Sequence, residues 1–142
     1  MAIDSRFKAL VQRAKVARLA TVDSQGAPHV VPVVFVFDGS KFFIPIDEKK
    51  KRVGPEELRR VKNIRGNSNV CLLIDNYEDD WSKLSFLMIH GIALLQSGGE
   101  NDVTMRRAYD RLIRKYPQYQ RVGLTDLWIV INPKRIVSWT NS

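Results

Sequence analysis

The chain has 142 residues, 44% of them hydrophobic and 27% charged, which is the composition of one globular domain spanning residues 1–142 and not of a disordered chain. Its 23 Lys and Arg against 15 Asp and Glu give a net charge of +8, so an anionic partner is expected: nucleic acid, an acidic membrane or a phosphorylated small molecule. One cysteine and two histidines exclude an internal disulfide and a finger-type metal site.

The first half of the chain predicts a helix followed by three strands. Asp4 or Ser5 can cap a helix whose apolar residues recur at three- and four-residue spacing: Phe7, Leu10, Val11 and Ala14. Strands are expected at 17–22, 29–37 and 42–46, separated by the turn sequence 23–26 and by Asp38-Gly39. Short turns between the three strands predict a meander.

The second half alternates helices and strands. Pro55 begins a helix that Gly66-Asn67 can end, and Asp102 caps another that runs through Tyr116. Strands are expected at 69–75, 84–96, 127–131 and 135–139, the last two on either side of Asn132-Pro133. About seven strands, three helices and short connections favour an antiparallel barrel or sandwich with helices over a Rossmann sheet.

The positive charge is concentrated in residues 49–65, which hold eight basic residues and two acidic ones, whereas each flanking region has a net charge of +1. The cluster follows a predicted strand and precedes a helix, an arrangement that suits a phosphate or carboxylate group. A solvated loop and helix face is the simpler interpretation. Nearly neutral flanks disfavour a nucleic-acid-binding surface.

Two prolines mark the strand from Pro28 to Val33. Proline removes a ladder donor, so this strand is expected at a sheet edge, at a bulge, or with its backbone open to a flat ligand. Trp81 and Trp139 could stack on a planar ligand or pack in a core or interface. No arrangement of residues predicts nucleophilic or acid–base catalysis, and His29 is a weak candidate for ligand contact.

Several of these segments, in order, resemble one family. Ala17 to Asp23 with Pro28 to Val33 resembles the opening of split-barrel flavin-binding proteins, the pyridoxamine 5'-phosphate oxidase-like superfamily, and its deazaflavin-dependent group fits best. Asn63-Ile64-Arg65 before Val70 resembles the family's "NLRR…V" step. The remaining landmarks are the acidic loop from Asp75 to Trp81, Tyr116 to Tyr119, and Arg135 to Trp139.

The resemblance implies a mainly β fold with helices, an antiparallel six-stranded split β-barrel of the FMN-binding type, forming a homodimer with cofactor sites at the interface. The cofactor ring would lie along His29, Val30, Val31, Pro32, Val33, Ile46 and Asp47. Its anionic tail would meet Lys49, Lys51 and Arg52, and the basic positions before the Asn63-Ile64 step are Arg60 and Lys62. Trp139 would come from the C-terminal strand of either subunit, and Trp81 is the second aromatic candidate.

The resemblance therefore implies an oxidoreductase that uses FMN or a deazaflavin (coenzyme F420), holds no metal, and transfers hydride between the cofactor and a small planar substrate. The chain ends without the Arg-x-His segment of authentic pyridoxamine phosphate oxidases, so that activity is not expected. A non-catalytic flavin carrier or sensor is the alternative, followed by a basic nucleic-acid-binding barrel. Neither a signal peptide nor a membrane span is evident, which predicts a cytoplasmic protein.

Overall fold

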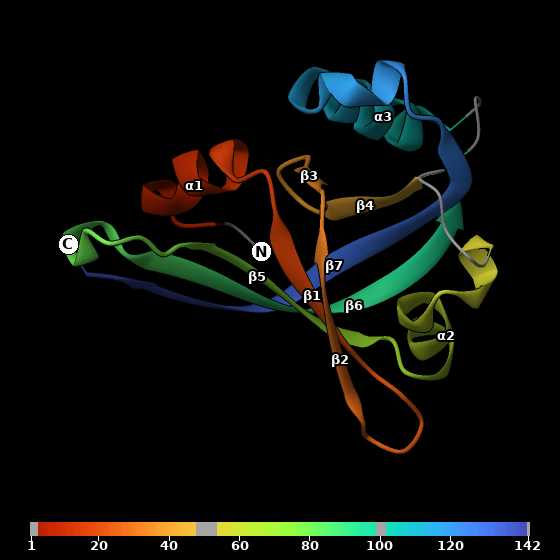
Figure 1. Ribbon diagram of the computed structural model, residues 1–142, viewed down its shortest axis with the longest axis horizontal. Coiled ribbons are helices and arrows are strands. Elements are labelled where there is room, and N and C mark those ends of the chain that lie inside the picture. The colour runs from red at the N-terminus through yellow and green to blue at the C-terminus, as the bar shows by residue number, and fades with distance from the viewer. Residues whose placement is uncertain (1–2, 48–53, 99–101, 142) are drawn as a thin grey trace.

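The computed structural model describes residues 3–47, 54–98 and 102–141. Three α-helices lie at separate corners of a single curved sheet (Figure 1). The helices are α1 (Lys8–Arg13), α2 (Arg59–Gly66) and α3 (Val103–Lys115). The strands are β1 (Ala17–Val22), β2 (Pro28–Val33), β3 (Val36–Phe37), β4 (Phe42–Asp47), β5 (Asn69–Asn76), β6 (Ser85–Ser97) and β7 (Leu124–Thr140).

The sheet is antiparallel in the order β2-β1-β5-β6-β7-β4-β3. The predicted mainly β, antiparallel class is confirmed. The predicted count of six strands is not what the described residues form, because they make seven strands in an open order that ends at β2 and at the two-residue strand β3. The long strands β6 and β7 run the length of the molecule, and the other strands lie on either side of this central pair (Figure 1).

The strand expected at 29–37 is two strands, so the predicted meander is wrong. β2 pairs with β1, and β3 pairs with β4 on the far side of the sheet order. Between them, the backbone of Phe35 bonds to the end of α3 and not to a strand: its N–H donates to the Tyr116 hydroxyl at 3.3 Å and its carbonyl accepts from the Lys115 amine at 3.1 Å. These bonds satisfy the Phe35 backbone where the ladder is interrupted.

The two strands expected around Asn132-Pro133 form the single strand β7. Proline lacks an N–H, yet it is tolerated here because the ladder is irregular at this point: His90 pairs with Arg135 while Gly91 pairs with Pro133, which leaves one extra residue on β7. A β-bulge thus replaces the expected break.

The sheet has a hydrophobic core on each face near β4. Phe42, Ile44 and Ile46 pack into the larger core with α1, α2 and most of the strands, whereas Phe43 packs into a second core under α3. Burial on both faces explains why β4 is apolar from Phe42 to Ile46 and does not alternate. No helix in the described part of the chain is long and apolar enough to cross a membrane.

Candidate functional site

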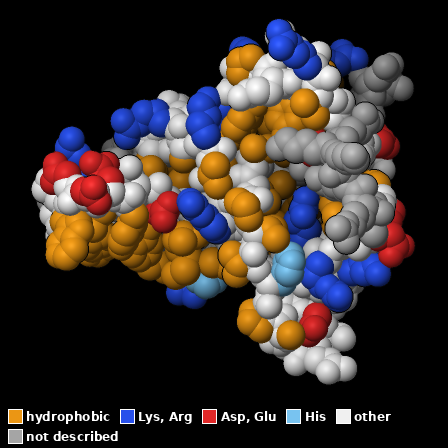
Figure 2. Space-filling model, viewed as in Figure 1, with side chains coloured by type: hydrophobic (Ala, Val, Ile, Leu, Met, Phe, Trp, Pro, Cys, Tyr) orange, Lys and Arg blue, Asp and Glu red, His pale blue; other side chains and the backbone are white. Residues whose placement is uncertain are grey.

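The first predicted ligand strand and the basic helix meet on one face. The Asn63 side-chain amide of α2 donates to the Thr21 hydroxyl of β1 at 3.0 Å, and both groups are buried. Thr21 pairs directly with His29 across the β1–β2 hairpin, so the two side chains share this face. Figure 2 shows Lys and Arg side chains beside a His side chain in this region, over α2 and β2.

Asp47, at the end of β4, interacts electrostatically with the same helix. Asp47 is the last described residue before the gap at 48–53, and its carboxylate accepts from the buried Tyr119 hydroxyl at 2.8 Å. Burial, and then this bond to the carboxylate, raise the pKa of Tyr119. Half-burial lowers the pKa of Arg60 on α2, and the charge of Asp47 partly opposes that shift. We call Thr21, His29, Asp47, Arg60 and Asn63 the α2–β2 face.

Two nitrogens on the α2–β2 face lack hydrogen-bond partners. Among the described residues, His29 Nδ1 and Arg60 Nε are the buried side-chain polar atoms that no hydrogen bond satisfies. Leaving such a group unpaired costs about 1–3 kcal/mol, and more for a charged group. Arg60 Nε can only donate, whereas His29 Nδ1 donates or accepts according to its tautomer. An anionic or carbonyl oxygen that reached Arg60 would satisfy its Nε.

The predicted ring-binding residues of β2 divide between its two sides. His29, Val31 and Val33 are part-buried or buried, whereas Pro32 is exposed and Val30 is 61% exposed. β2 is the last strand of the sheet order, so the expectation of an edge strand is confirmed. A flat ligand against its open backbone edge stays a prediction.

Ile46 lies deeper than a ligand-contacting side chain would. It is 1% exposed in the larger core, and its carbonyl accepts from the Thr125 hydroxyl at 2.7 Å. The Ile46 side chain is therefore not available to a ligand, contrary to the prediction.

The helix separates the two predicted cations of α2. Arg60 is half-buried beside Asp47, while Lys62 is exposed and its amine lies 3.0 Å from the Glu57 carboxylate. Residues two apart on a helix point in different directions, which accounts for the separation. Lys49, Lys51 and Arg52 lie outside the described residues.

Trp81 and Trp139 lie at the other end of the sheet. Trp139 stacks on Phe86, its partner in the β6–β7 register, with ring centroids 5.9 Å apart. The next pair in this register is Ser85 with Thr140, at the end of both strands. That end meets the last residue of β5, whereas α2 leads into its first residue, and eight residues of strand span about 23 Å. One chain therefore does not bring these tryptophans to the α2–β2 face. They are 72% and 39% exposed, at the end where Figure 2 shows a broad hydrophobic surface.

The sequence did not point to Thr21, Asn63 or Tyr119 as members of the site. Two signals were available: a buried carboxylate such as Asp47 needs a donor, and Asn63 and Tyr119 both lie in segments that carry the family resemblance. The described residues hold no group of three or more His, Cys, Asp or Glu side chains that could bind a metal.

Comparison with known proteins connects this geometry with a family. The family model of pyridoxamine 5'-phosphate oxidase matches residues 3–140. A curated protein of Streptomyces rimosus, a 5a,11a-dehydrotetracycline/5a,11a-dehydrooxytetracycline reductase, is 30% identical over 124 residues, covering 86% of this chain and 72% of its own length.

Solved structures share the fold at lower identity. A Listeria innocua protein provisionally assigned as pyridoxamine 5'-phosphate oxidase matches with a TM-score of 0.66 at 25% identity, covering 96% of this chain and 97% of its own. The heme storage protein HutZ of Vibrio cholerae has a TM-score of 0.72 at 18% identity, covering 96% and 94%. An F420 reductase has a TM-score of 0.67 at 18% identity, covering 95% and 98%.

Proposed function

The chain belongs to the pyridoxamine 5'-phosphate oxidase-like family, and from this premise we propose that it is an oxidoreductase that uses FMN or an F420-type deazaflavin. The observation that carries the proposal is the pair of unpaired buried nitrogens, His29 Nδ1 and Arg60 Nε, on the α2–β2 face. Both belong to residues that the family resemblance had already assigned to cofactor binding. The reductase activity of the Streptomyces relative supports the reaction class.

The residues of the α2–β2 face suggest a division of roles. Arg60 would donate from Nε to an oxygen of the cofactor, and the charge of Asp47 would stabilise that guanidinium while Tyr119 holds Asp47. Lys49, Lys51 and Arg52, which follow Asp47 in the chain, would bind the phosphate or acidic tail. His29 would meet the ring from β2. The bound cofactor supplies the hydride chemistry, and the protein supplies binding, orientation and electrostatics.

We further propose that two copies of the chain complete each site. Trp81 and Trp139 are separated from the α2–β2 face by the length of strand β5, so they would reach a cofactor only from a second copy. Their exposure at a hydrophobic end of the sheet suits an interface. A homodimer would carry two such sites.

Cofactor titration of matched variants tests the proposal. The purified protein is titrated with FMN and with F420, and binding is followed by fluorescence. We expect micromolar binding of one of them and at least a tenfold loss of affinity in Arg60→Gln, because a charge-assisted hydrogen bond is lost. Lys62→Gln removes the same charge from the same helix but from an exposed, ion-paired side chain, so its affinity should change less than twofold.

The same preparation separates the alternatives. If neither cofactor binds in the micromolar range, the cofactor assignment fails, and heme uptake with a Soret band would instead favour the function of the HutZ neighbour. Reduced cofactor is then offered with a planar acceptor, 5a,11a-dehydrotetracycline, the substrate class of the Streptomyces relative. Oxidation of the cofactor supports an enzyme, whereas tight binding without turnover over an acceptor panel supports a carrier. Steeply salt-dependent oligonucleotide binding would favour the nucleic-acid alternative.

A further inference from the structure

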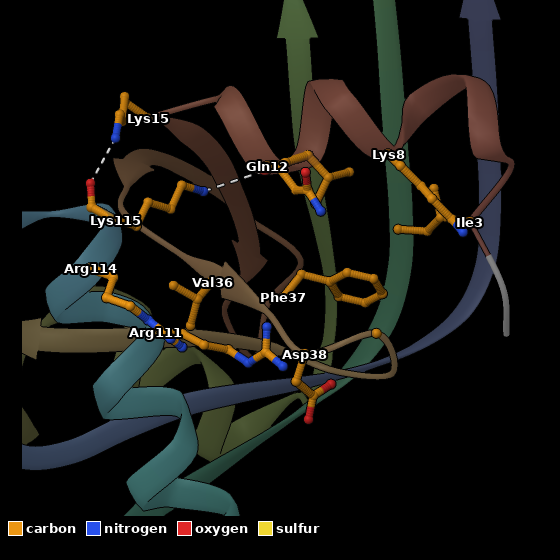
Figure 3. Close-up of a pocket in the computed structure, with 12 residues that line it drawn as sticks. Ile3, Lys8, Gln12, Lys15, Val36, Phe37, Asp38, Arg111, Arg114 and Lys115 are labelled. Atoms are coloured by element: carbon orange, nitrogen blue, oxygen red, sulfur yellow. Dashed lines mark hydrogen bonds between the residues drawn. The ribbon is translucent and has the colours of Figure 1, made fainter.

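A large cleft lies away from the α2–β2 face. It has a volume of about 830 Å³ and opens between α1, the β3–β4 hairpin and the C-terminal half of α3 (Figure 3). None of its lining residues belongs to the α2–β2 face or to the predicted cofactor contacts. Its volume falls within the range of small-molecule sites, which is about 300–1,000 Å³.

The cleft gathers five cations from two distant parts of the chain: Lys8, Lys15, Arg111, Arg114 and Lys115. In the described part of the chain, no carboxylate forms an ion pair with any of them. The single acidic lining residue, Asp38, is already engaged, because its Oδ1 accepts from the N–H groups of Ser40 and Lys41 at 2.8 and 2.7 Å. Five cations against one carboxylate leave the cleft with a net positive charge.

Two of the cations are built into the wall of the cleft. The Lys15 amine donates to the Lys115 carbonyl at 2.7 Å. The Lys115 amine donates to the carbonyls of Phe35 and Val11 at 3.1 and 3.4 Å, and it lies 3.7 Å from the Phe35 ring centroid. Burial, and then the charge of Lys15, lower the pKa of Lys115 to about 8, which an anion in the cleft would relieve. Both amines add positive potential at fixed positions.

The other three cations are free to move toward a ligand. Lys8, Arg111 and Arg114 are exposed, and none of their side chains has a hydrogen bond to another described residue. Arg111 and Arg114 are three residues apart on α3, which places them on one side of the helix. Figure 3 shows Arg111 pointing into the cleft from α3, with Lys8 approaching from α1 on the other side.

The floor of the cleft is apolar. Ile3, Val11, Val36 and Phe37 contribute to it, and Phe37 is held by stacking on Phe42 with ring centroids 4.4 Å apart. A fully hydrated ion would leave this floor uncovered, and an apolar molecule would leave the cations unused. The lining therefore suits a molecule that has both an apolar body and an anionic group.

We propose that the cleft between α1, β3 and α3 binds a small organic anion, with an aromatic or aliphatic body over Phe37 and a carboxylate or phosphate between Arg111 and Arg114. A small molecule fits better than an acidic protein or a nucleic acid because the cations converge on a concave, apolar-floored cleft. An extended polyanion would favour cations spread over a surface. The site lies outside the proposed cofactor site and does not depend on it.

The probe for the test is 1-naphthyl phosphate, with inorganic phosphate as the comparison. Binding is measured by isothermal titration calorimetry on the protein both free of cofactor and saturated with whichever cofactor binds. We expect the naphthyl ester to bind at least tenfold more tightly than phosphate, since only the ester covers the apolar floor. We expect Arg111→Gln/Arg114→Gln to weaken the ester at least tenfold.

A matched control carries the same change of charge elsewhere. Arg121→Gln/Lys134→Gln removes two exposed cations outside the cleft and should alter affinity less than twofold. Equal losses in the two double variants would show a general charge effect and overturn the proposal, as would equal affinity for ester and phosphate. Competition of the ester with FMN or F420 for one site would also overturn it, and so would tighter binding of polyglutamate or an oligonucleotide. Ester binding that persists in cofactor-saturated protein supports the cleft even if the oxidoreductase proposal fails.

Discussion

Single residues decide which of the predicted cations can serve a ligand. The sequence placed Arg60 and Lys62 together as basic positions, yet the helix turns one toward Asp47 and the other toward Glu57. Periodicity predicted the apolar face of α2 correctly, with Val61 and Ile64 buried. It could not show which polar residue would be half-buried, because that depends on where β4 ends and on the bond between Tyr119 and Asp47.

Lys115 makes stability depend on pH. Its pKa is about 8 in the folded protein and 10.5 when unperturbed, so between these values the unfolded chain binds more protons and the free energy of unfolding rises with pH. The pKa values of Tyr116 and Tyr119 are raised, so above their ordinary value of 10 they act in the opposite direction. The raised pKa of the Cys71 thiol, whose ordinary value is 9.0, opposes Lys115 in the upper part of this range. We therefore expect the urea midpoint to rise between about pH 8 and 9.

Two variants check this assignment. Lys115→Met should flatten the pH dependence of the urea midpoint in that window. Lys8→Met removes an exposed lysine from the same cleft and should leave the dependence intact. A slope that survives in Lys115→Met would show that another group causes it.

At the scale of elements, strict periodicity and clear caps made the predictions reliable. The helix expected from Asp102 through Tyr116 is α3, capped by the Asp102 carboxylate on the Met105 N–H. Two strand boundaries were wrong for another reason: the strand expected at 29–37 is divided, and the strands expected at 127–131 and 135–139 are joined. In the first, the backbone of Phe35 bonds to the end of α3, 80 residues along the chain. In the second, a bulge accommodates Pro133. Both depend on distant partners that local sequence does not display.

A substitution at Gly91 tests the close packing of β6 and β7 at the bulge. A Cβ added there would lie 2.7 Å from both the Asn132 carbonyl oxygen and the Ile131 Cγ2, so the long β6–β7 ladder would have to shift. We expect Gly91→Ala to lower the free energy of unfolding by about 1–3 kcal/mol, as overpacked sites do. Urea unfolding monitored by circular dichroism measures the change.

Gly66→Ala is the matched control for this substitution. Gly66 ends α2 with nothing within 4 Å of an added Cβ, and its φ is not positive. The change should be neutral or stabilise the protein by up to about 1 kcal/mol, because alanine restricts the unfolded chain. Similar destabilisation by both substitutions would contradict the steric role of Gly91.

At the scale of the molecule, the net charge of +8 separates into two basic regions. The sequence revealed the cluster at 49–65 because its members are contiguous. The cleft cations were hidden because the acidic loop around Asp79 balances α3 in any count along the chain, although folding brings α3 to Lys8 and Lys15. Counting charge along the chain therefore detects a basic site only when its residues are close together in the sequence.

The proposal of a homodimer with shared cofactor sites can be tested sharply, because it assigns Trp139 and Arg60 of one site to different chains. Trp139→Ala should weaken both cofactor binding and self-association, measured by fluorescence titration and sedimentation velocity. Tyr109→Ala removes an aromatic side chain of similar exposure, 45% against 39%, from α3 and should affect neither.

Mixing the two defective variants then distinguishes a shared site from a merely structural effect. In a dimer of one Arg60→Gln chain and one Trp139→Ala chain, one site would contain both substitutions and the other would contain neither. After random exchange of subunits, about a quarter of all sites should regain the affinity of the unaltered protein, although each variant alone has none. The recovered fraction should appear as a separate high-affinity phase in the titration. If mixing restores no such phase while the chains exchange, Trp139 acts within its own chain and the shared-site proposal is wrong.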